Sequence, residues 1–335
     1  MSPRLTVALA AVVLSAATCS TDADPVPTDP GSGNGEVVEI PGVISDAGSL
    51  AVLPDSVVAP CDGQLCRWSL DGAFVSRYDG GAIVAVSEAG LWTDRVEDGV
   101  VQLVLLDATS GDEVRAADAY EVADVQDGPG QGLRDIAVSP DGARVAGVGA
   151  DGLVHLWAAD DLADESTIEV GGNAVAAAFS PDGSQIAVAA SEAPVTIHDV
   201  ASGEQVGELD APAQGALEWA EAGWIASASF TLDDDAATTV WDGGTREVLA
   251  TLDVAAYRLD VADATTLLLT EKNEQDVVRW QWEEDDVVRL TGATDVPRAV
   301  THSPDGEVIA MSPRDGVLAW PADGGQPTTF EKPGG

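Results

Sequence analysis

One four-residue turn motif returns along the chain at a fixed interval. Ser139-Pro140-Asp141-Gly142 recurs from Ser180 and again from Ser303. The first interval is 41 residues (180 − 139), and the second is 123 (303 − 180), three times the first. Proline presets φ at the second turn position, aspartate suits the third, and glycine accepts the left-handed conformation that follows. The interval predicts a chain of similar units, each turning back on itself at this motif.

Four weaker copies of the turn fill the remaining intervals, and they begin at Leu53, Ser87, Ala220 and Ala262. The seven turn starts have a mean spacing near 41.7 residues ((303 − 53)/6). Short apolar runs rich in β-branched residues flank the turns, as in Ile136-Ala137-Val138, which indicates tight hairpins. We therefore predict an all-β fold, a β-propeller of seven four-stranded blades. Six or eight blades are the alternatives, because the first two intervals are uneven.

An aromatic residue marks the third strand of most units. The markers are Trp68, Trp157, Trp241, Trp282 and Trp320, with His198 in the fourth unit. From about residue 37 to 333 the chain resembles the WD-repeat family of β-propellers, through the Ser-Pro-Asp-Gly turns, strands such as Val154-His155-Leu156-Trp157, and one Trp-Asp pair at Trp241. The family's Gly-His dipeptide is absent throughout, so its internal His–Ser–Asp–Trp hydrogen-bond network is not expected here.

The N-terminal segment has the pattern of an export signal. Arg4 supplies a positive charge, and Leu5 to Ala17 is an uncharged apolar run of 13 residues, a length that suits a signal peptide. The segment ends at Ala16-Ala17-Thr18-Cys19 and resembles a bacterial lipoprotein signal, in which the cysteine after the cleavage site takes the lipid. The resemblance implies lipidation of Cys19. Simple secretion, with cleavage after Ala17, is the alternative.

The chain then divides into three parts. Residues 1–18 form the signal peptide, and residues 19–35 form a disordered tether that carries the candidate lipidated Cys19 and is rich in Pro, Gly and Asp. Residues 36–335 form a single WD-repeat-like propeller. We expect the protein on the outer side of the cell membrane, attached to it only through the lipid, or secreted.

Two segments compete for the outer strand of the last blade. Val37–Ile40 and Thr328–Phe330 could each supply it, and we favour Val37–Ile40 because its β-branched alternation is stronger. That choice would join the two ends of the chain in one sheet, as in the WD-repeat family, and would spare an exposed edge.

The remaining two cysteines are predicted to form a disulfide. Cys61 and Cys66 flank Asp62-Gly63-Gln64-Leu65, which reads as a tight hairpin loop. Cysteines that close such a hairpin can come within bonding distance, and an exported protein meets an oxidising environment. A metal site here is not expected, because no histidine or further cysteine is near in sequence.

The formal net charge of −43 restricts the partners. Phosphates would be repelled, and there is no basic stripe, so nucleic acid is excluded as a partner class. The negative electrostatic field of the chain favours basic protein surfaces or peptides and divalent cations as partners. The need to keep an exported domain soluble explains the charge more simply. We expect a monomer whose partner is a protein or peptide.

Acidic residues concentrate in loops predicted to join second to third strands. These candidate interaction or cation-binding residues are Asp94, Arg95, Glu97 and Asp98 in the second unit, Asp233, Asp234 and Asp235 in the fifth, and Glu271, Glu274 and Asp276 in the sixth. Weak Ca²⁺ binding is conceivable, because hard cations prefer oxygen ligands. No Asp-x-Asp-x-Asp-Gly loop is present, so we assign no confident metal or cofactor.

Catalytic motifs are absent from the sequence. It contains no Gly-x-Ser-x-Gly elbow, no phosphate-cradling loop with lysine and no His-Glu-x-x-His helix. We therefore assign no catalytic residue and expect a non-enzymatic interaction scaffold. Two alternatives stay open: an enzyme or small-ligand binder that uses the central channel, and a sensory ectodomain that responds to cations.

Overall fold

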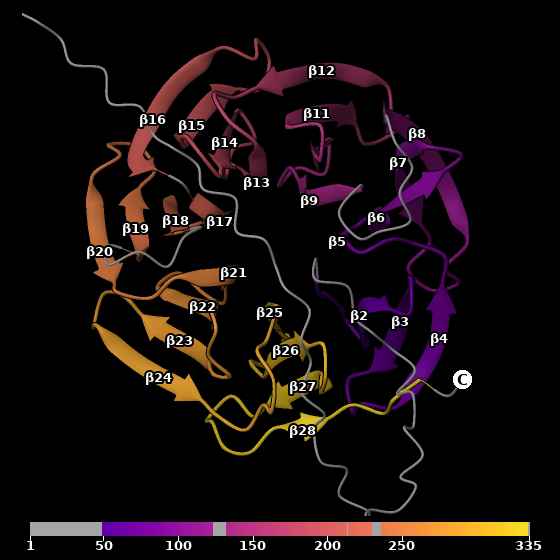
Figure 1. Ribbon diagram of the computed structural model, residues 1–335, viewed down its shortest axis with the longest axis vertical. Coiled ribbons are helices and arrows are strands. Elements are labelled where there is room, and N and C mark those ends of the chain that lie inside the picture. The colour runs from indigo at the N-terminus through magenta and orange to yellow at the C-terminus, as the bar shows by residue number, and fades with distance from the viewer. Residues whose placement is uncertain (1–48, 123–131, 213, 230–235, 334–335) are drawn as a thin grey trace, which may run out of the picture. The chain divides into compact units, whose positions relative to one another are not determined.

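The computed structural model describes residues 49–122, 132–212, 214–229 and 236–333. These residues belong to the compact unit Ile40–Gly335 and form strands and turns, with no helix among them. The strands make seven antiparallel sheets of four, and each sheet uses four consecutive strands. The sheets are the blades of a seven-bladed propeller (Figure 1). The seven-blade prediction is confirmed.

The first four blades follow the chain in order. Blade 1 contains β1 (Ala51–Leu53), β2 (Ser56–Cys61), β3 (Gln64–Ser69) and β4 (Phe74–Tyr78). Blade 2 contains β5 (Val84–Ser87), β6 (Gly90–Glu97), β7 (Val100–Leu106) and β8 (Glu113–Glu121). Blade 3 contains β9 (Leu133–Val138), β10 (Arg144–Gly149), β11 (Leu153–Ala158) and β12 (Asp164–Glu169). Blade 4 contains β13 (Ala174–Phe179), β14 (Gln185–Ala190), β15 (Pro194–Asp199) and β16 (Gln205–Pro212).

The last three blades repeat the pattern. Blade 5 contains β17 (Gln214–Trp219), β18 (Trp224–Ser229), β19 (Thr238–Asp242) and β20 (Val248–Leu252). Blade 6 contains β21 (Ala256–Val261), β22 (Thr266–Glu271), β23 (Val277–Gln281) and β24 (Asp286–Leu290). Blade 7 contains β25 (Ala299–His302), β26 (Val308–Ser312), β27 (Gly316–Trp320) and β28 (Thr328–Thr329). The first strand of each blade is innermost, and β1 contacts both β5 and β25, which closes the ring.

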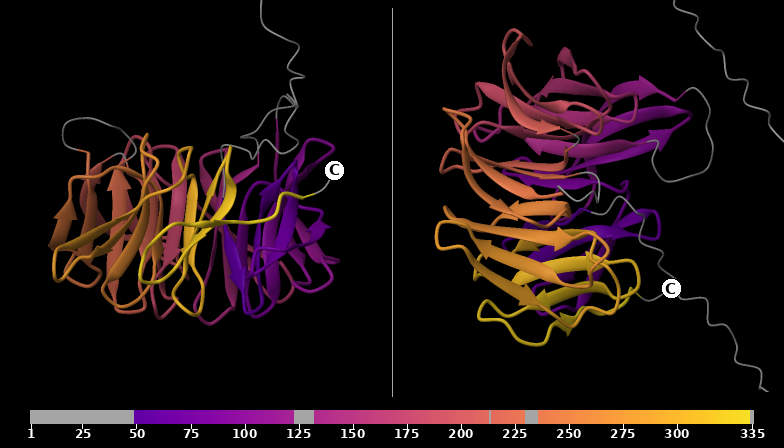
Figure 2. Two further views of the ribbon diagram at one scale, coloured as in Figure 1. Left: turned by 90° about the horizontal axis from the view of Figure 1, so that it is seen from below. Right: turned by 60° about the vertical axis from the view of Figure 1, so that its left-hand side comes forward.

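The repeated turns join the first and second strands of their blades. In blade 3 the Gly142 amide donates to the Ser139 carbonyl oxygen at 2.8 Å, and the Ser139 hydroxyl donates to Asp141 at 2.6 Å. Gly142 has φ +67°, the left-handed region that favours glycine. We call the propeller surface that carries these turns the turn face. Because neighbouring strands are antiparallel, loops between second and third strands lie on the opposite face (Figure 2).

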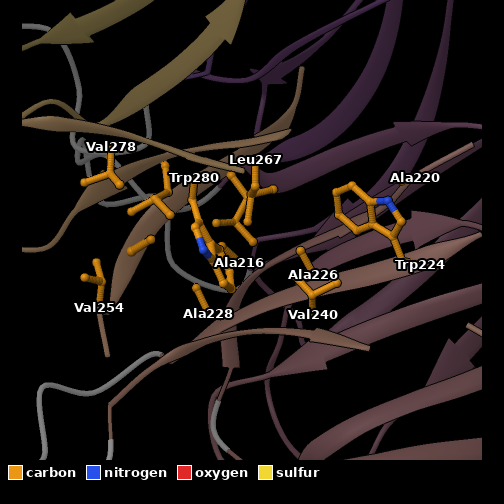
Figure 3. Packing of buried hydrophobic residues seen from close by; sticks show 13 residues of the cluster. Ala216, Ala220, Trp224, Ala226, Ala228, Val240, Val254, Leu267, Val278 and Trp280 are labelled. Atoms are coloured by element: carbon orange, nitrogen blue, oxygen red, sulfur yellow. The ribbon is translucent and has the colours of Figure 1, made fainter. Parts of the chain in front are cut away.

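Seven clusters of buried apolar residues form the core, one between each pair of neighbouring blades. In the cluster between blades 5 and 6, Trp280 on β23 lies beside Ala216 and Ala228 of blade 5 (Figure 3). Trp68, Trp157, Trp241 and Trp320 lie in the corresponding clusters of their own blades. Each blade therefore buries its apolar surface on its neighbours, which lets a long chain fold without one large core.

One of the third-strand markers was placed two residues too late. Trp280 pairs with Leu267 in the register in which Trp241 pairs with Ile225 of its own blade, and it is fully buried. Trp282 follows β23 and makes an edge-to-face contact with Trp224, with ring centroids 5.9 Å apart. Trp280 and Trp282 both lie at a distance from the turn that suits the third-strand marker. Only the pairing of the strands shows which of the two occupies that position.

The ring is closed by the C-terminal segment, so the preference for Val37–Ile40 was wrong. The outer strand of blade 7 is β28 (Thr328–Thr329), paired with β27. Beyond it the chain crosses to blade 1 (Figure 1), where the Glu331 amide donates to the Gly72 carbonyl oxygen at 2.8 Å. Phe330 is buried with Trp68 in the cluster between blades 7 and 1. The contacts after β28 outweigh the higher β propensity of residues 37–40, which lie outside the described residues.

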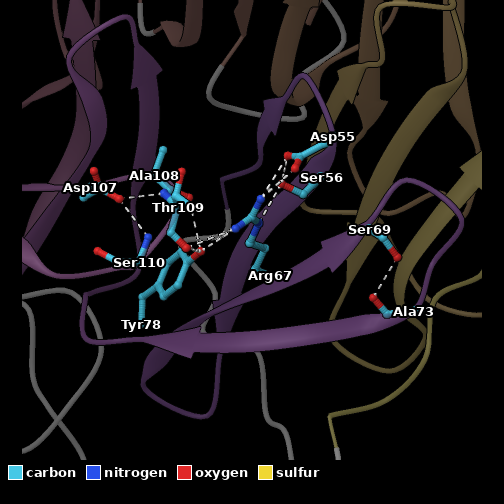
Figure 4. A network of polar contacts seen from close by, with 10 residues as sticks. All are labelled: Asp55, Ser56, Arg67, Ser69, Ala73, Tyr78, Asp107, Ala108, Thr109 and Ser110. Atoms are coloured by element: carbon cyan, nitrogen blue, oxygen red, sulfur yellow. Dashed lines mark hydrogen bonds and ion pairs between the residues drawn. The ribbon is translucent and has the colours of Figure 1, made fainter.

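A polar network joins blade 1 to blade 2. The Arg67 guanidinium on β3 contacts Asp55 at 2.9 Å and donates to the Thr109 carbonyl oxygen of blade 2 at 3.2 Å (Figure 4). The Tyr78 hydroxyl also lies 3.2 Å from that carbonyl oxygen. Arg67 is mostly buried, and its donors are satisfied by both blades, so the network supplements the apolar cluster between them.

Candidate functional site

The innermost strands surround a central channel that contains a cavity of about 550 Å³. Residues of β1, β5, β9, β17, β21 and β25 line it. The charged and titratable lining residues are Asp135, Glu218, Arg258, Asp260 and His302. A cavity toward which several polar groups converge is the usual form of a binding site, so the channel is the candidate site.

The repeat register places these side chains at related positions. Glu218, Asp260 and Thr301 each lie two residues before the turn start of their blade, where blades 3 and 4 have alanine. Asp135 and Arg258 each lie four residues before theirs. Side chains two residues apart on a strand point to the same side of the sheet. The side chains two and four residues before a turn start therefore point in the same direction. Blades 5, 6 and 7 therefore supply most of the polar part of the channel wall, and Asp135 of blade 3 adds one further carboxyl group.

Arg258 reaches from blade 6 toward blade 3. Its Nη2 lies 3.5 Å from the backbone carbonyl oxygen of Arg134 on β9. Its backbone amide donates to the Thr270 hydroxyl at 3.1 Å, which fixes the start of the side chain. Burial raises the pKa of Asp135, while the Arg258 charge and the Ala177 amide oppose that shift. The Arg258 charge therefore partly neutralises the Asp135 carboxyl group across the channel.

The pKa of the Glu218 carboxyl group is raised in the channel. Burial raises the pKa of Glu218 well above its ordinary value, nearby Asp260 and Asp135 raise it further, and Arg258 opposes the shift. Within the described residues, no hydrogen-bond donor reaches this carboxyl group. A carboxyl group with a raised pKa at a cavity is a common property of functional sites, because such sites are shaped to change protonation or to bind charge.

Asp260 and His302 form a pair across the boundary between blades 6 and 7. His302 Nδ1 lies 2.7 Å from Asp260 Oδ2, and the Thr301 hydroxyl lies 3.5 Å from Asp260 Oδ1. The hydrogen bond to Asp260 raises the pKa of His302, against the opposing effect of burial. The sequence indicated only that His302 adjoins a turn, so its partner is a finding of the structure.

Two of the grooves that adjoin the channel cavity on the turn face flank blade 6. One, of about 620 Å³, lies between the turns of blades 5 and 6 and shares Glu218 with the channel. The other, of about 280 Å³, lies between blades 6 and 7 and shares His302. The exposed Glu221 and Asp263 line the first groove. Blade 6 is therefore flanked by two hollows that meet the channel at titratable side chains.

The predicted acidic segment of blade 2 is mostly strand. Asp94 lies within β6 and is 4% exposed, and burial raises its pKa to about 6 although backbone amides such as that of Ile83 donate to it. Arg95 and Glu97 lie further along β6, where Arg95 bridges to Glu113 at 2.8 Å. Asp98 forms the turn before β7, with φ +50°. Only the end of this segment is a loop on the opposite face.

The predicted acidic loop of blade 6 lies on the opposite face from the turns. Glu271 ends β22 and forms an ion pair with Arg289 on β24, while Glu274 and Asp276 lie in the loop that follows. The predicted partner loop, Asp233, Asp234 and Asp235, lies outside the described residues. The structure therefore separates the acidic loop of blade 6 from the acidic channel wall that opens on the turn face.

The residues that the structure describes contain no group of three or more His, Cys, Asp or Glu arranged to hold a metal ion. Weak Ca²⁺ binding stays a prediction.

The disulfide between Cys61 and Cys66 is confirmed, and it closes the hairpin of β2 and β3 with a Cα–Cα distance of 5.7 Å. Cys19 lies outside the described residues. Among the described residues, none forms a helix long and apolar enough to cross a membrane.

The sequence contained a signal for the channel site that was not used. Aligning the units on their turns shows alanine two residues before the turn start in blades 1 to 4, and Glu218, Asp260 and Thr301 in blades 5 to 7. A change from alanine to a polar residue on a channel-lining strand marks the polar wall.

Comparison of the chain with protein-family models and with curated proteins finds no match to either.

Proposed function

We propose that the protein is an exported protein-interaction module, lipid-anchored through Cys19, that holds a basic partner on the turn face of a WD-repeat-like propeller. The propeller fold is commonly used as a rigid scaffold for protein interaction. Its turns and loops can vary while the blades hold them in place, which suits recognition of a partner.

The observation that carries this proposal is the acidic wall at the turn-face side of blades 5 to 7. Glu218 and Asp260 line the channel cavity, and Glu221 and Asp263 line the adjoining groove. A concave surface on which carboxyl groups outnumber basic groups has a negative electrostatic field that favours a basic partner. The negative net charge of the whole chain also attracts a basic partner at long range.

The lipid anchor is supported by the sequence pattern at residues 1–35. A short apolar run, Cys19 and a Pro-, Gly- and Asp-rich segment follow one another in the order expected for a tethered exported protein. A single lipid chain gives only marginal membrane attachment, so further acyl chains on the same cysteine would be required for a stable anchor.

In-cell cross-linking with mass spectrometry tests the proposal. Lys272 and Lys332 are the only lysines, so an amine-to-amine reagent would react poorly, whereas a carbodiimide joins the abundant carboxylates directly to lysines of a partner. We expect one reproducible envelope partner with the native chain and its loss in Cys19→Ser, which would no longer be anchored. Absence of any partner from folded, abundant protein would contradict the scaffold function.

Binding of a small ligand in the channel, with or without catalysis, is a second candidate function. Its support is the cavity of about 550 Å³ with the perturbed Glu218 carboxyl group in its wall. Native mass spectrometry of protein purified from its own cells distinguishes the two candidates. A bound small molecule that survives gentle desolvation would favour this function, and an empty chain that still cross-links to a protein would favour the scaffold.

A further inference from the structure

The channel cavity has two chemically different walls. Blades 1 and 2 line it with aliphatic side chains, among them Val52 on β1 and Val86 on β5. Val86 is 40% exposed, so its apolar surface is open to a ligand. Blades 5 and 6 line it with Glu218 and Asp260. A ligand that fills the cavity must therefore present an apolar body to one wall and a polar or charged end to the other.

The charge balance of the polar wall selects the sign of that end. Three carboxyl groups, those of Asp135, Glu218 and Asp260, face one arginine and one histidine. Asp135 accepts a hydrogen bond from the Ala177 amide at 3.0 Å, and Asp260 is paired with His302. Glu218 is left, among the described residues, with no donor. When Glu218 is ionised, a cationic donor is the group that would satisfy it.

The same geometry favours an ammonium group over a guanidinium group. An ammonium is a compact charge with three donors on a flexible aliphatic stem, whereas a guanidinium is a broad planar fork. The cavity already holds the Arg258 guanidinium across its width, within reach of the Arg134 carbonyl oxygen. A second broad planar cation would compete with it for space, whereas a compact ammonium needs less of the width.

We infer that the channel binds a primary alkylammonium group, with the ammonium at Glu218 and Asp260 and the aliphatic stem against Val52 and Val86. The inference rests on the proposed function, because the cavity is reached from the turn face at His302 and Pro304. A lysine side chain of a docked partner segment and a free diamine both supply this chemistry, and the test below distinguishes them.

Calorimetric titration of the purified mature chain tests the inference directly. The probes are 1,5-diaminopentane, the capped tripeptide Gly-Lys-Gly, and the capped tripeptide with norleucine in place of lysine, which keeps the stem and removes the charge. We expect binding of an amine probe and none of the norleucine peptide. Diamine binding alone assigns a free amine as the ligand, and peptide binding assigns the side chain of a partner.

Two variants locate the binding at Glu218. Glu218→Gln should weaken the amine probe about tenfold or more, since one charge-assisted hydrogen bond is lost. Glu218→Asp should keep part of the affinity because it keeps the charge. Glu274→Gln, an exposed carboxyl group in the loop after β22 on the opposite face, is the matched control and should leave the affinity unchanged.

Proton release gives an independent readout. Because burial and neighbouring carboxylates disfavour ionised Glu218, binding of an ammonium should expel a proton, and the measured heat should depend on the buffer. Equal binding of the norleucine peptide, no effect of Glu218→Gln, or no heat with any probe would overturn the inference. A cross-linked protein partner found alongside any of these results would leave the scaffold function standing without the lysine site.

Discussion

The indole Nε1 of Trp68 donates a hydrogen bond of 2.7 Å to the backbone carbonyl oxygen of Glu331, which lies 263 positions further along the chain. Phe330, beside it, is 5% exposed and packs in the same cluster as Trp68. The Glu331 carboxylate also accepts from the Phe74 amide at 3.1 Å. Blades 7 and 1 are thus joined by side-chain packing and backbone hydrogen bonds rather than by a shared sheet.

Phe330→Ala should destabilise the fold strongly. The substitution removes a buried aromatic ring from the blade 7–blade 1 cluster, a change that costs about 3–5 kcal/mol. Urea denaturation followed by tryptophan fluorescence measures the loss. Deletion of residues 36–40 is the paired control and should leave the midpoint unchanged, because β28 already holds the outer position of blade 7. The reverse ranking of the two changes would contradict this mode of closure.

Trp280 should contribute more to stability than Trp282. Trp280 is fully buried between blades 5 and 6, so Trp280→Ala should lower the free energy of unfolding by about 3–5 kcal/mol. Trp282 is only partly buried, and Trp282→Ala should cost at most about 2 kcal/mol. Chemical denaturation of the two variants gives the comparison, and equal losses would show that the β23 register is wrong.

Asp94 should make the fold less stable as the pH rises from 4 to 7. The pKa of Asp94 is raised by burial to about 6, above its ordinary value of 3.8, so the folded state binds more protons in this window. Stability then falls with rising pH, on the order of 3 kcal/mol in total. The free energy of unfolding of the native chain minus that of Asp94→Asn isolates the effect. A difference that is flat with pH would exclude it.

Glu218→Gln should raise the melting temperature at pH 8 and raise it less at pH 5. The raised pKa of Glu218 means that its ionised form is disfavoured in the folded state, so its cost appears as the pH increases. For a chain of this size each kcal/mol corresponds to about 2 °C. Calorimetric melting at the two pH values measures the change. The control Glu221→Gln should change the melting temperature by the same amount at pH 5 and at pH 8. A melting temperature of Glu218→Gln below that of the native chain at pH 8 would contradict the prediction.

The blade count was predictable because the signal is repeated. Each Ser-Pro-Asp-Gly turn is fixed by local chemistry, as the Ser139–Asp141 hydrogen bond shows, and the spacing of the turns gives the size of the unit. The disulfide was equally local, since Cys61 and Cys66 close one hairpin. Such features depend on residues that are near each other in sequence.

Ring closure and the channel depend on residues far apart in sequence. The β propensity of residues 37–40 favoured the wrong segment, because the contacts that decide closure involve Phe330 and Trp68. Asp94 was read as part of an acidic loop, yet the amides that surround its carboxylate come from the residues near Ile83 and Leu133. A Cβ on Gly81 or Gly132 would collide with that carboxylate, which explains glycine at both positions. Only the folded ring brings these groups together.

Mapping carbodiimide cross-links in intact cells tests whether a basic partner docks on the turn face. Docking there should give cross-linked peptides that join Glu221 or Asp263 to partner lysines, with a lower yield in Glu221→Gln and an unchanged yield in Glu274→Gln on the opposite face. Cross-links that join the partner to Glu274 or Asp276, with none on the turn face, would contradict it.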